Sequence, residues 1–423
     1  MKLLFIGDPH YKPSNVKDTE LMESQVLFYI EKLKPDVVIN LGDTLDTHER
    51  IHIGSLARSV QFMNEISKLT KHVVLIGNHD RKNNSEFLTE VHPFIACTIM
   101  NNNNNNIGFV STGLVSDKIL YVPYVPNGRF KEACDIILKS HFKLAEDFKI
   151  DKYSEYINLI VCHQEFKGVK MGGIISEDGD DYKVFDVPII SGHIHETQII
   201  ENVLYPGTPM LHGFGSKNVC RLNYVELSNS NSNSNSNLNL NSDLLLNSID
   251  SKDTQCKWNS EFNPSHLLTD IFESAKEKFY KKSETYPKSH KIECYLANNI
   301  RSYLIPIVYR NKITLKFDIN ELKSLVTSNK EDELKILEHL GVYFNDYTEY
   351  KIVIHIQNSK SILKSSVSDK LSKYVKDVVF KKDDESLNNT EKVDFKKFKS
   401  FKENIMSKLN EDERKLFRKI ISL

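Results

Sequence analysis

The sequence lacks the features that mark secreted, membrane-spanning or strongly charged proteins. None of its six cysteines forms a C-x-x-C pair, so neither a zinc ribbon nor a disulfide framework is predicted, and reduced thiols fit best. The apolar run that begins at Met1 is too short for a signal peptide, and no stretch approaches the length of a membrane span. We therefore expect a soluble intracellular protein, in the cytoplasm or nucleus, that has no membrane partner.

The sequence also lacks an excess of charge of either sign. The formal net charge is −1, which excludes a globally basic nucleic-acid binder. Any DNA-binding surface would have to come from local patches, from metal ions or from a partner protein. The chain has 423 residues, of which 40% are hydrophobic and 27% charged. These are globular values, and the length indicates two or three domains.

Residues 1–227 have the pattern of a layered α/β domain. Short apolar runs rich in β-branched residues alternate with helix-like stretches, and each run ends in a polar or glycine turn. Met22–Lys34 and Ile53–Leu69 have helical periodicity. The predicted buried strands are Leu3–Ile6, Val37–Leu41, Val73–Ile76, Ile119–Val122, Leu159–Val161 and Ile189–Ile190.

Two polar low-complexity segments interrupt the chain. Asn101–Asn106 is predicted to be an expanded loop, and residues 228–253 contain a Ser/Asn repeat that has no means of building a core. The repeat follows a predicted strand at Arg221–Leu227. If Thr254–Phe262 is the returning strand, the repeat is an insertion at a hairpin tip; a domain boundary is an equally good interpretation.

The rest of the chain changes character. Residues 254–382 are predicted to form a smaller α+β module, with strands at Lys291–Ala297, Lys312–Ile319 and Glu349–Ile356. Residues 383–423 read as a charged linker followed by two short amphipathic helices. Such helices either pack on their own domain or lie in a groove of a partner protein.

Five short polar motifs follow the predicted strands of the first domain. Because residues just past the strand ends of an open α/β sheet share one crevice, we expect these motifs to converge. Asp and His together suit Mn²⁺, Fe²⁺ or Zn²⁺ better than Mg²⁺ or Ca²⁺. The motifs are Asp8-Pro9-His10, Gly42-Asp43, Gly77-Asn78-His79-Asp80, Cys162-His163 and Gly192-His193-Ile194-His195.

The motif residues divide into two sets of metal ligands. Asp8, His10 and His195 form one predicted site, and Asn78, His163 and His193 form the other. Asp43 can bridge the two, because a carboxylate offers two oxygens. Such a metal pair supplies hydroxide at neutral pH and clamps an in-line displacement at phosphorus.

The remaining motif residues have predicted roles in proton transfer. His79 lies next to a ligand and is the candidate that protonates a leaving oxygen, and Asp80 is the candidate that orients it. A lone histidine near a strand end is more often a packing or solvated residue, and it is the joint occurrence of the motifs that favours function. Four histidines without such company are interpreted as structural or surface residues: His72, His92, His141 and His212.

The order of these motifs resembles that of the calcineurin-like metallophosphoesterase superfamily, over residues 1–213. The resemblance implies a four-layer α/β/β/α sandwich with a dimetal site at one end. Ser/Thr protein phosphatases of the superfamily typically carry G-D-x-x-D-R-G and G-N-H-E. The segments here read G-D-T-L-D-T-H and G-N-H-D, which weakens a protein-phosphatase interpretation.

Within the superfamily, the chain is most similar to the SbcD-type DNA double-strand-break-repair nucleases, especially the phage recombination endonuclease subunit. Leu204-Tyr205-Pro206-Gly207-Thr208-Pro209 resembles a Y-x-G-[ST]-P segment of these nucleases. The smaller module stands where that family has its DNA-capping domain. The terminal helices stand where the family docks onto an SbcC-like coiled-coil ATPase. The resemblance implies two Mn²⁺ ions, with Fe²⁺, Zn²⁺ or Mg²⁺ as alternatives, DNA as substrate and a homodimer.

One position departs from the nuclease pattern. Many members have a substrate-positioning histidine three residues after the bridging Asp, where this chain has Asp46. His48 or Arg50 could take that role. Two further functions stay open: a stand-alone phosphodiesterase that acts on small nucleotides, and a non-catalytic scaffold of the same fold.

Overall fold

The structure is a computed structural model of the chain. The residues that it describes are 1–48, 50–96, 106–214, 218–228, 256–260, 263–280, 290–318, 322, 335–337, 342, 348–356 and 367–382. The Ser/Asn repeat, most of the asparagine run and the predicted terminal helices of residues 383–423 lie outside this set.

Two sheets face each other at the centre of the molecule. The first contains, in spatial order, β14 (Glu293–Ala297), β15 (Ile300–Pro306), β13 (Arg221–Leu227), β1 (Lys2–Ile6), β2 (Val37–Asn40), β3 (Lys71–Leu75) and β4 (Ile107–Val110). The second contains β11 (Gln198–Ile200), β12 (Val203–Tyr205), β10 (Ile189–Gly192), β7 (Leu159–His163), β6 (Ile119–Val122) and β5 (Leu114–Ser116). All six strands predicted for this domain are confirmed.

The alternation of side chains along each strand builds the layers. In β1, Leu3 and Phe5 enter the core between the sheets, whereas Leu4 and Ile6 enter the core under the helices. The parallel strand β7 does the same on the other sheet, with Leu159 and Val161 facing inward. Because successive side chains of a strand point to opposite faces, a run that is apolar throughout must be buried on both sides.

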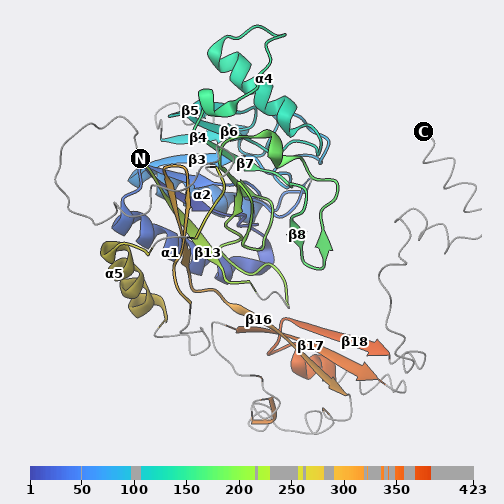
Figure 1. Ribbon diagram of the computed structural model, residues 1–423. Helices are drawn as coiled ribbons and strands as arrows, with labels where there is room; N and C mark the ends of the chain where they lie inside the picture. Colours follow the sequence, from blue (N-terminus) through green and yellow to red (C-terminus); the bar gives the residue numbers. More distant parts are fainter. Residues whose placement is uncertain are drawn as a thin grey trace, which may run out of the picture.

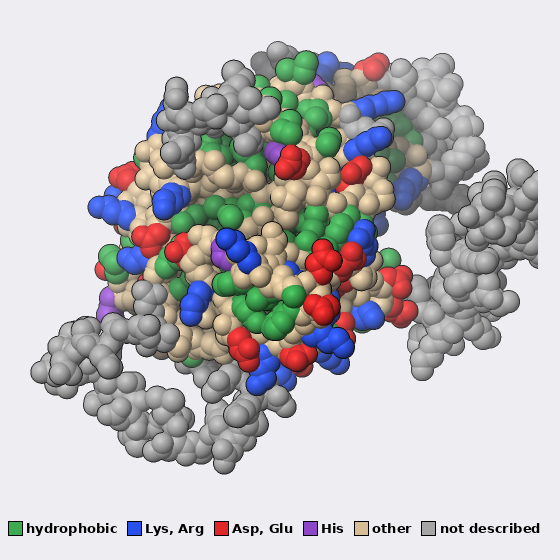
Figure 2. Space-filling model, turned by 90° about the horizontal axis from the view of Figure 1, so that it is seen from above, with side chains coloured by type: hydrophobic (Ala, Val, Ile, Leu, Met, Phe, Trp, Pro, Cys, Tyr) green, Lys and Arg blue, Asp and Glu red, His purple; other side chains and the backbone are tan. Residues whose placement is uncertain are grey.

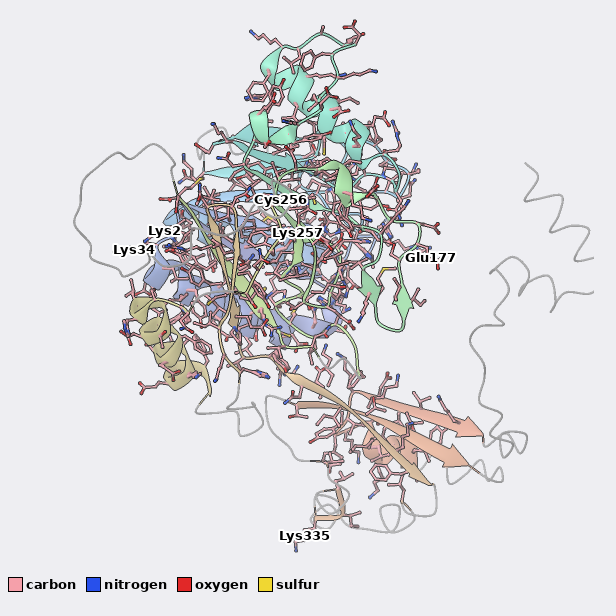
Figure 3. All side chains as sticks on the ribbon, viewed as in Figure 1. Lys2, Lys34, Glu177, Cys256, Lys257 and Lys335 are labelled. Atoms are coloured by element: carbon pink, nitrogen blue, oxygen red, sulfur yellow. The ribbon has the colours of Figure 1, made fainter. Side chains whose placement is uncertain are left out.

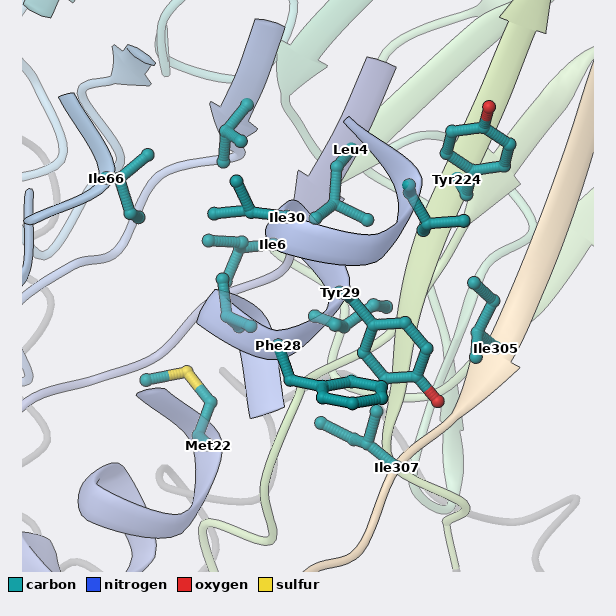
Figure 4. Packing of buried hydrophobic residues seen from close by; sticks show 14 of the residues in the cluster. Leu4, Ile6, Met22, Phe28, Tyr29, Ile30, Ile66, Tyr224, Ile305 and Ile307 are labelled. Atoms are coloured by element: carbon teal, nitrogen blue, oxygen red, sulfur yellow. The ribbon is translucent and has the colours of Figure 1, made fainter. Parts of the chain in front are cut away.

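Helices cover the two outer faces. α1 (Val16–Leu33), α2 (Ile53–Leu69) and α5 (His266–Ala275) pack on the first sheet, and α4 (Phe130–Phe142) packs on the second (Figure 1). Figure 4 shows side chains of α1 in contact with those of β1, β13 and β15. The predicted four-layer α/β/β/α fold is therefore confirmed. No helix in the described part of the chain is long and apolar enough to cross a bilayer.

The boundary of the first domain differs from the predicted one. The antiparallel neighbours of β13 are β1 and β15, so Thr254–Phe262 is not the returning strand. Residues 256–260 instead cross the sandwich, where the Trp258 ring nitrogen donates to the Asn202 carbonyl at 3.0 Å. The strand predicted at Lys291–Ala297 is β14 of the main sheet and not part of the small module. The smaller module therefore begins after Pro306, some fifty residues later than expected.

The small module is a parallel three-stranded sheet with its own core. β16 (Asn311–Asp318), β17 (Thr348–Ile356) and β18 (Asp377–Lys382) pair in that order, and β17 lies in the middle. Ile352 and Ile354 are fully buried against the short helical segment that contains Val367 and Leu371. In Figure 3, Lys335 lies in this module, whereas Cys256 and Lys257 lie on the main body.

Buried charges join the module to α1. Asp18 of α1 is 2% exposed and lies 3.4 Å from the Lys312 ammonium group. Arg310 lies 2.7 Å from Glu349 of β17, and Lys376 lies 3.0 Å from the same carboxylate. Lys376 also donates to the carbonyl of Ser14 at 3.0 Å. The module is thus attached just after the first polar motif of the chain.

Candidate metal centre

The two sheets bring the five polar motifs to one edge. Asp8, Asp43 and Asn78 follow β1, β2 and β3 of the first sheet, which are parallel neighbours. His163 and His193 come from the ends of β7 and β10, which are parallel neighbours in the second sheet. The carboxyl ends of both sets meet at the same end of the sandwich. The convergence expected from the sequence therefore occurs, with each sheet contributing part of the centre.

The backbone at the strand ends is strained. His10, Asp43 and His193 have φ angles of +43°, +47° and +75°. Residues other than glycine rarely adopt this left-handed region, and each instance costs of order 1–3 kcal/mol. Strain at three motif residues indicates that their side-chain directions matter more here than local stability.

Two motif glycines provide the space for this approach. A Cβ on Gly77 would lie 2.2 Å from the Asp43 carboxylate, and a Cβ on Gly192 would lie 2.6 Å from that of Asp8. Any larger residue would therefore push a carboxylate out of the centre. The glycines of the motifs are needed for close packing and not only for turns.

The first donor group contains Asp8, His10 and His195. The Nε2 atoms of His10 and His195 lie 3.1 Å apart, and His195 Nε2 lies 3.9 Å from Asp8 Oδ2. His10 Nε2 is also 3.6 Å from Asp43 Oδ2. These donors therefore point toward one common position.

The second donor group contains Asn78, His163 and His193. The amide atom of Asn78 that points into the centre lies 3.1 Å from both His163 Nε2 and His193 Nδ1. His163 Nε2 lies 3.3 Å from Asp43 Oδ1. Each oxygen of Asp43 thus faces a different donor group, which is the geometry that a bridging carboxylate requires.

The residues present fit a pair of divalent cations. Asp8 is 1% exposed, and within the described chain neither of its oxygens accepts a well-formed hydrogen bond, although the His193 backbone N–H faces this carboxylate. Burial, with the nearby Asp43, raises the pKa of Asp8 to about 8. A buried carboxylate that lacks well-formed hydrogen bonds is costly unless a cation lies beside it. The mixed Asp, Asn and His donors suit borderline metals such as Mn²⁺, Fe²⁺ and Zn²⁺.

The electrostatics of the second donor group point the same way. Burial lowers the pKa of His163, but Asp43 and Asp8 outweigh that effect and raise it to about 9. The same contacts hold the pKa of Asp43 well below its usual range, against its own burial. The raised pKa of His163 favours a proton between these side chains, and a cation bound there would displace it.

The structure gives His79 and Asp80 different surroundings from those predicted. His79 Nδ1 lies 2.7 Å from the carbonyl oxygen of Asp46, so this carbonyl and not Asp80 orients the ring. Asp80 is fully buried and accepts the backbone N–H groups of Thr44, Leu45 and Gly77, at 2.9–3.2 Å. Its role is to hold two motif loops together. The ring of His79 lies 4.9 Å from that of His10, within reach of the centre.

The three substrate-positioning candidates lie at different distances from the donors. His48 stacks on His79 at 4.6 Å, and its Nδ1 lies 2.9 Å from the Asn78 carbonyl. Asp46 accepts a hydrogen bond from Lys12 at 2.9 Å, and its Oδ1 lies 3.6 Å from His10 Nδ1. Arg50 is exposed. Asp46 and His48 therefore border the centre, and Lys12 is a cation at its rim that the sequence did not reveal.

His212 also lies at the centre, although the sequence placed it among the structural histidines. Its ring lies 4.7 Å from that of His10 and 4.8 Å from that of His195. It follows β12, which pairs in parallel with β10, so its loop leaves the same edge of the sheet as the G-H-x-H motif. Recognition of Val203–Tyr205 as a parallel strand would have revealed this position. His72 and His92 are buried elsewhere, as expected.

The comparisons with known proteins agree with this geometry. The family model described as calcineurin-like phosphoesterase matches residues 1–197. "Putative phosphoesterase 244L" of Invertebrate iridescent virus 6 is 37% identical over 220 residues, which cover 51% of this chain and 72% of the relative. "Putative phosphoesterase 078R" of Invertebrate iridescent virus 3 is 35% identical over 216 residues, 51% of this chain and 59% of that one.

A solved structure of YfcE, a phosphoesterase from E. coli, is 13% identical, covers 53% of this chain and 88% of its own, and has a TM-score of 0.24. A likeness of that size carries no argument here. The family assignment rests on the family model and on the viral relative 244L, which is matched over most of its length. The chain belongs to the calcineurin-like phosphoesterase family and is a metallophosphoesterase hydrolase.

Proposed function

We propose that this phosphoesterase is the nuclease subunit of a DNA repair or recombination complex, with two Mn²⁺ ions and an SbcC-like ATPase as partner. The observation that carries the proposal is the second module, which is fixed to the main body by Lys376 and Ser14, four residues after His10. A catalyst of small phosphoesters needs no such module beside its ligand loop. A polymer substrate extends beyond the reacting bond on both sides, so it can contact such a module.

In this proposal the side chains divide the work as follows. Asp8, His10 and His195 would hold one ion, Asn78, His163 and His193 would hold the other, and Asp43 would serve both donor groups. When bound, the ions polarise the phosphodiester and supply hydroxide at neutral pH. His79 keeps one ring nitrogen on the Asp46 carbonyl, so the other nitrogen is available to protonate the departing sugar oxygen.

DNA affinity in this proposal comes from the ions, the module and the partner rather than from one basic surface. The face drawn in Figure 2 carries lysine and arginine side chains interspersed with acidic ones. Contacts to the phosphate backbone position a duplex without reading its sequence, as an end-processing nuclease requires. The predicted partner-binding helices belong to residues 383–423.

The test is cleavage of labelled linear duplex and single-stranded DNA in Mn²⁺, with wild type, His79→Ala and Asp43→Ala. We expect cleavage by wild type and loss of cleavage in both variants. Hydrolysis of bis(p-nitrophenyl) phosphate by wild type, measured in parallel, reports the metal centre itself. If wild type hydrolyses that ester but leaves DNA intact with and without the ATPase, the nuclease proposal is wrong. The function then favoured is that of a stand-alone phosphodiesterase that acts on small nucleotides.

Deletion of residues 383–423 tests the partner. The shortened chain is expected to hydrolyse the small ester like wild type and to lose co-purification with the SbcC-like ATPase. Retained co-purification would contradict docking through the terminal segment. A purified wild type that binds no divalent metal would instead favour the non-catalytic scaffold.

A further inference from the structure

The unassigned histidine at the metal centre, His212, has the geometry of a ligand. Its ring lies within 5 Å of two histidine rings of the first donor group, at 4.7 Å from His10 and 4.8 Å from His195. One ring nitrogen from each of the three lies within 4.8 Å of the others. We propose that His212 is a further protein ligand of the ion held by Asp8, His10 and His195.

The hydrogen bond that His212 makes determines which of its nitrogens would be available to a metal ion. His212 Nε2 lies 2.8 Å from the backbone carbonyl oxygen of Asp8. A carbonyl oxygen only accepts, so Nε2 carries the hydrogen and Nδ1 carries the lone pair. Nδ1 is buried and has no hydrogen-bond partner among the described residues. An acceptor left in this state is unfavourable unless an ion takes its lone pair.

His163 in the second donor group shows the same arrangement. Its Nδ1 lies 2.8 Å from the Leu41 carbonyl oxygen, and its Nε2 faces Asn78 and Asp43. Metal-ligating histidines almost always donate their other ring N–H to a carbonyl or carboxylate, which fixes the tautomer and the ring direction. His212 and His163 thus repeat one pattern, one in each donor group.

His92 shows that burial alone does not produce this pattern. Its ring is buried, and its Nδ1 also lacks a hydrogen-bond partner within the described chain. However, its neighbours are the rings of Phe94 and Phe109, at 6.3 Å and 5.9 Å, and the charged group that acts on it is Arg81, a cation. His212, in contrast, combines an available Nδ1 with two converging histidines and a hydrogen bond to the backbone of Asp8.

A further imidazole changes the character of the first site. With His212, the residues that would hold this ion are three histidines, Asp8 and Asp43. Nitrogen-rich sets favour Zn²⁺, Fe²⁺ and Co²⁺ over Mg²⁺, because imidazole is a softer donor than carboxylate or water. The inference deepens the metal assignment made above and does not depend on DNA as the substrate.

The test measures metal binding rather than turnover. Zn²⁺, Mn²⁺ and Co²⁺ are titrated into chelator-treated wild type, His212→Phe, His212→Gln and the buried control His92→Phe, with calorimetry for affinity and visible absorption for Co²⁺. In both His212 variants we expect one of two sites to weaken for Zn²⁺ by about 10- to 100-fold, with a changed Co²⁺ spectrum. The control should bind like wild type.

His212→Gln distinguishes a histidine that binds the metal from one that only supports the backbone of Asp8. Its amide nitrogen can still donate to the Asp8 carbonyl, but it offers oxygen in place of imidazole nitrogen. If His212→Gln restores the Zn²⁺ affinity and Co²⁺ spectrum of wild type, His212 only supports the backbone and the inference is overturned. Unchanged binding in His212→Phe overturns it too. A wild type that binds no metal at all would instead remove the proposed function, so the two failures are distinguishable.

Discussion

Replacement of Asp80 tests how the ligand loops are held. The Asp80 carboxylate is fully buried and accepts three backbone N–H groups, from Thr44, Leu45 and Gly77. Two of these belong to the loop that follows Asp43, and the third precedes Asn78. One side chain therefore fixes both the bridging ligand and a ligand of the second donor group.

The size of the effect follows from these contacts. Asp80→Ala leaves three buried N–H groups without an acceptor, and each costs about 1–3 kcal/mol, so the free energy of unfolding should fall by about 3–9 kcal/mol. Asp80→Asn keeps one acceptor oxygen and should lose about 2 kcal/mol. The surface residue Asp181 accepts one N–H, from Lys183, and Asp181→Ala should lose only about 1 kcal/mol.

The assay is urea unfolding of chelator-treated protein, with Mn²⁺ affinity measured on the same samples. Asp80→Ala should weaken metal binding as well as stability, since the loops it releases carry Asp43 and Asn78. The pH–rate profile of Asp80→Asn should keep the shape of wild type, because the Asp46 carbonyl holds His79. Unchanged stability together with a shifted profile would refute this reasoning and return Asp80 to an orienting role.

Three further predictions concern the rim of the centre, the core and the module. Lys12→Met should raise KM for a phosphodiester by up to about fivefold, since it leaves the negative charge of Asp46 without its lysine partner. Adding Asp46→Asn should reverse most of the increase, and additive effects in a double-mutant cycle would contradict this. Burial lowers the pKa of His72 to about 4, whereas the unfolded chain takes up this proton near pH 6.5, so the folded state loses stability as pH falls below about 6.5. Between about pH 8 and pH 5, the free energy of unfolding in urea melts should fall by about 2 kcal/mol more for wild type than for His72→Leu. Equal losses would refute this prediction. Glu349→Gln removes the carboxylate that faces the buried cations Arg310 and Lys312, so it should lower the free energy of unfolding by about 3 kcal/mol and expose the link near Pro306 to protease. The control Lys351→Gln breaks an exposed ion pair and should lower it by less than about 1 kcal/mol. Equal effects would show that the buried charges do not anchor the module.

The local parts of the fold could be predicted from the sequence, because local signals determine them. Apolar β-branched runs predicted the central strands, and the polar motifs after five of them contain seven side chains that do converge. The role of those side chains as metal ligands stays a prediction.

Pairing over long distances could not be predicted in the same way. Nothing local distinguishes the predicted strand at Lys291–Ala297 from strands of the small module. It belongs to the main sheet because β14 pairs with β15, and β15 pairs with β13. For the same reason His212 was missed, because its position depends on the parallel pairing of a three-residue strand with β10. Asp80 was misread because its partners are backbone N–H groups, which leave no trace in the identity of nearby residues.

The position of β1 in the first sheet has a consequence for synthesis. β1 pairs with β2 on one side and with β13 on the other, and β13 ends at Leu227. Because the chain is translated at about 5–20 residues per second, one edge of β1 stays unpaired for roughly 10–45 s until β13 has been synthesised. A nascent chain with such an unpaired apolar edge is a target for other strands and for chaperones. Conditions that slow translation should therefore reduce the soluble yield of this protein more than its final stability suggests.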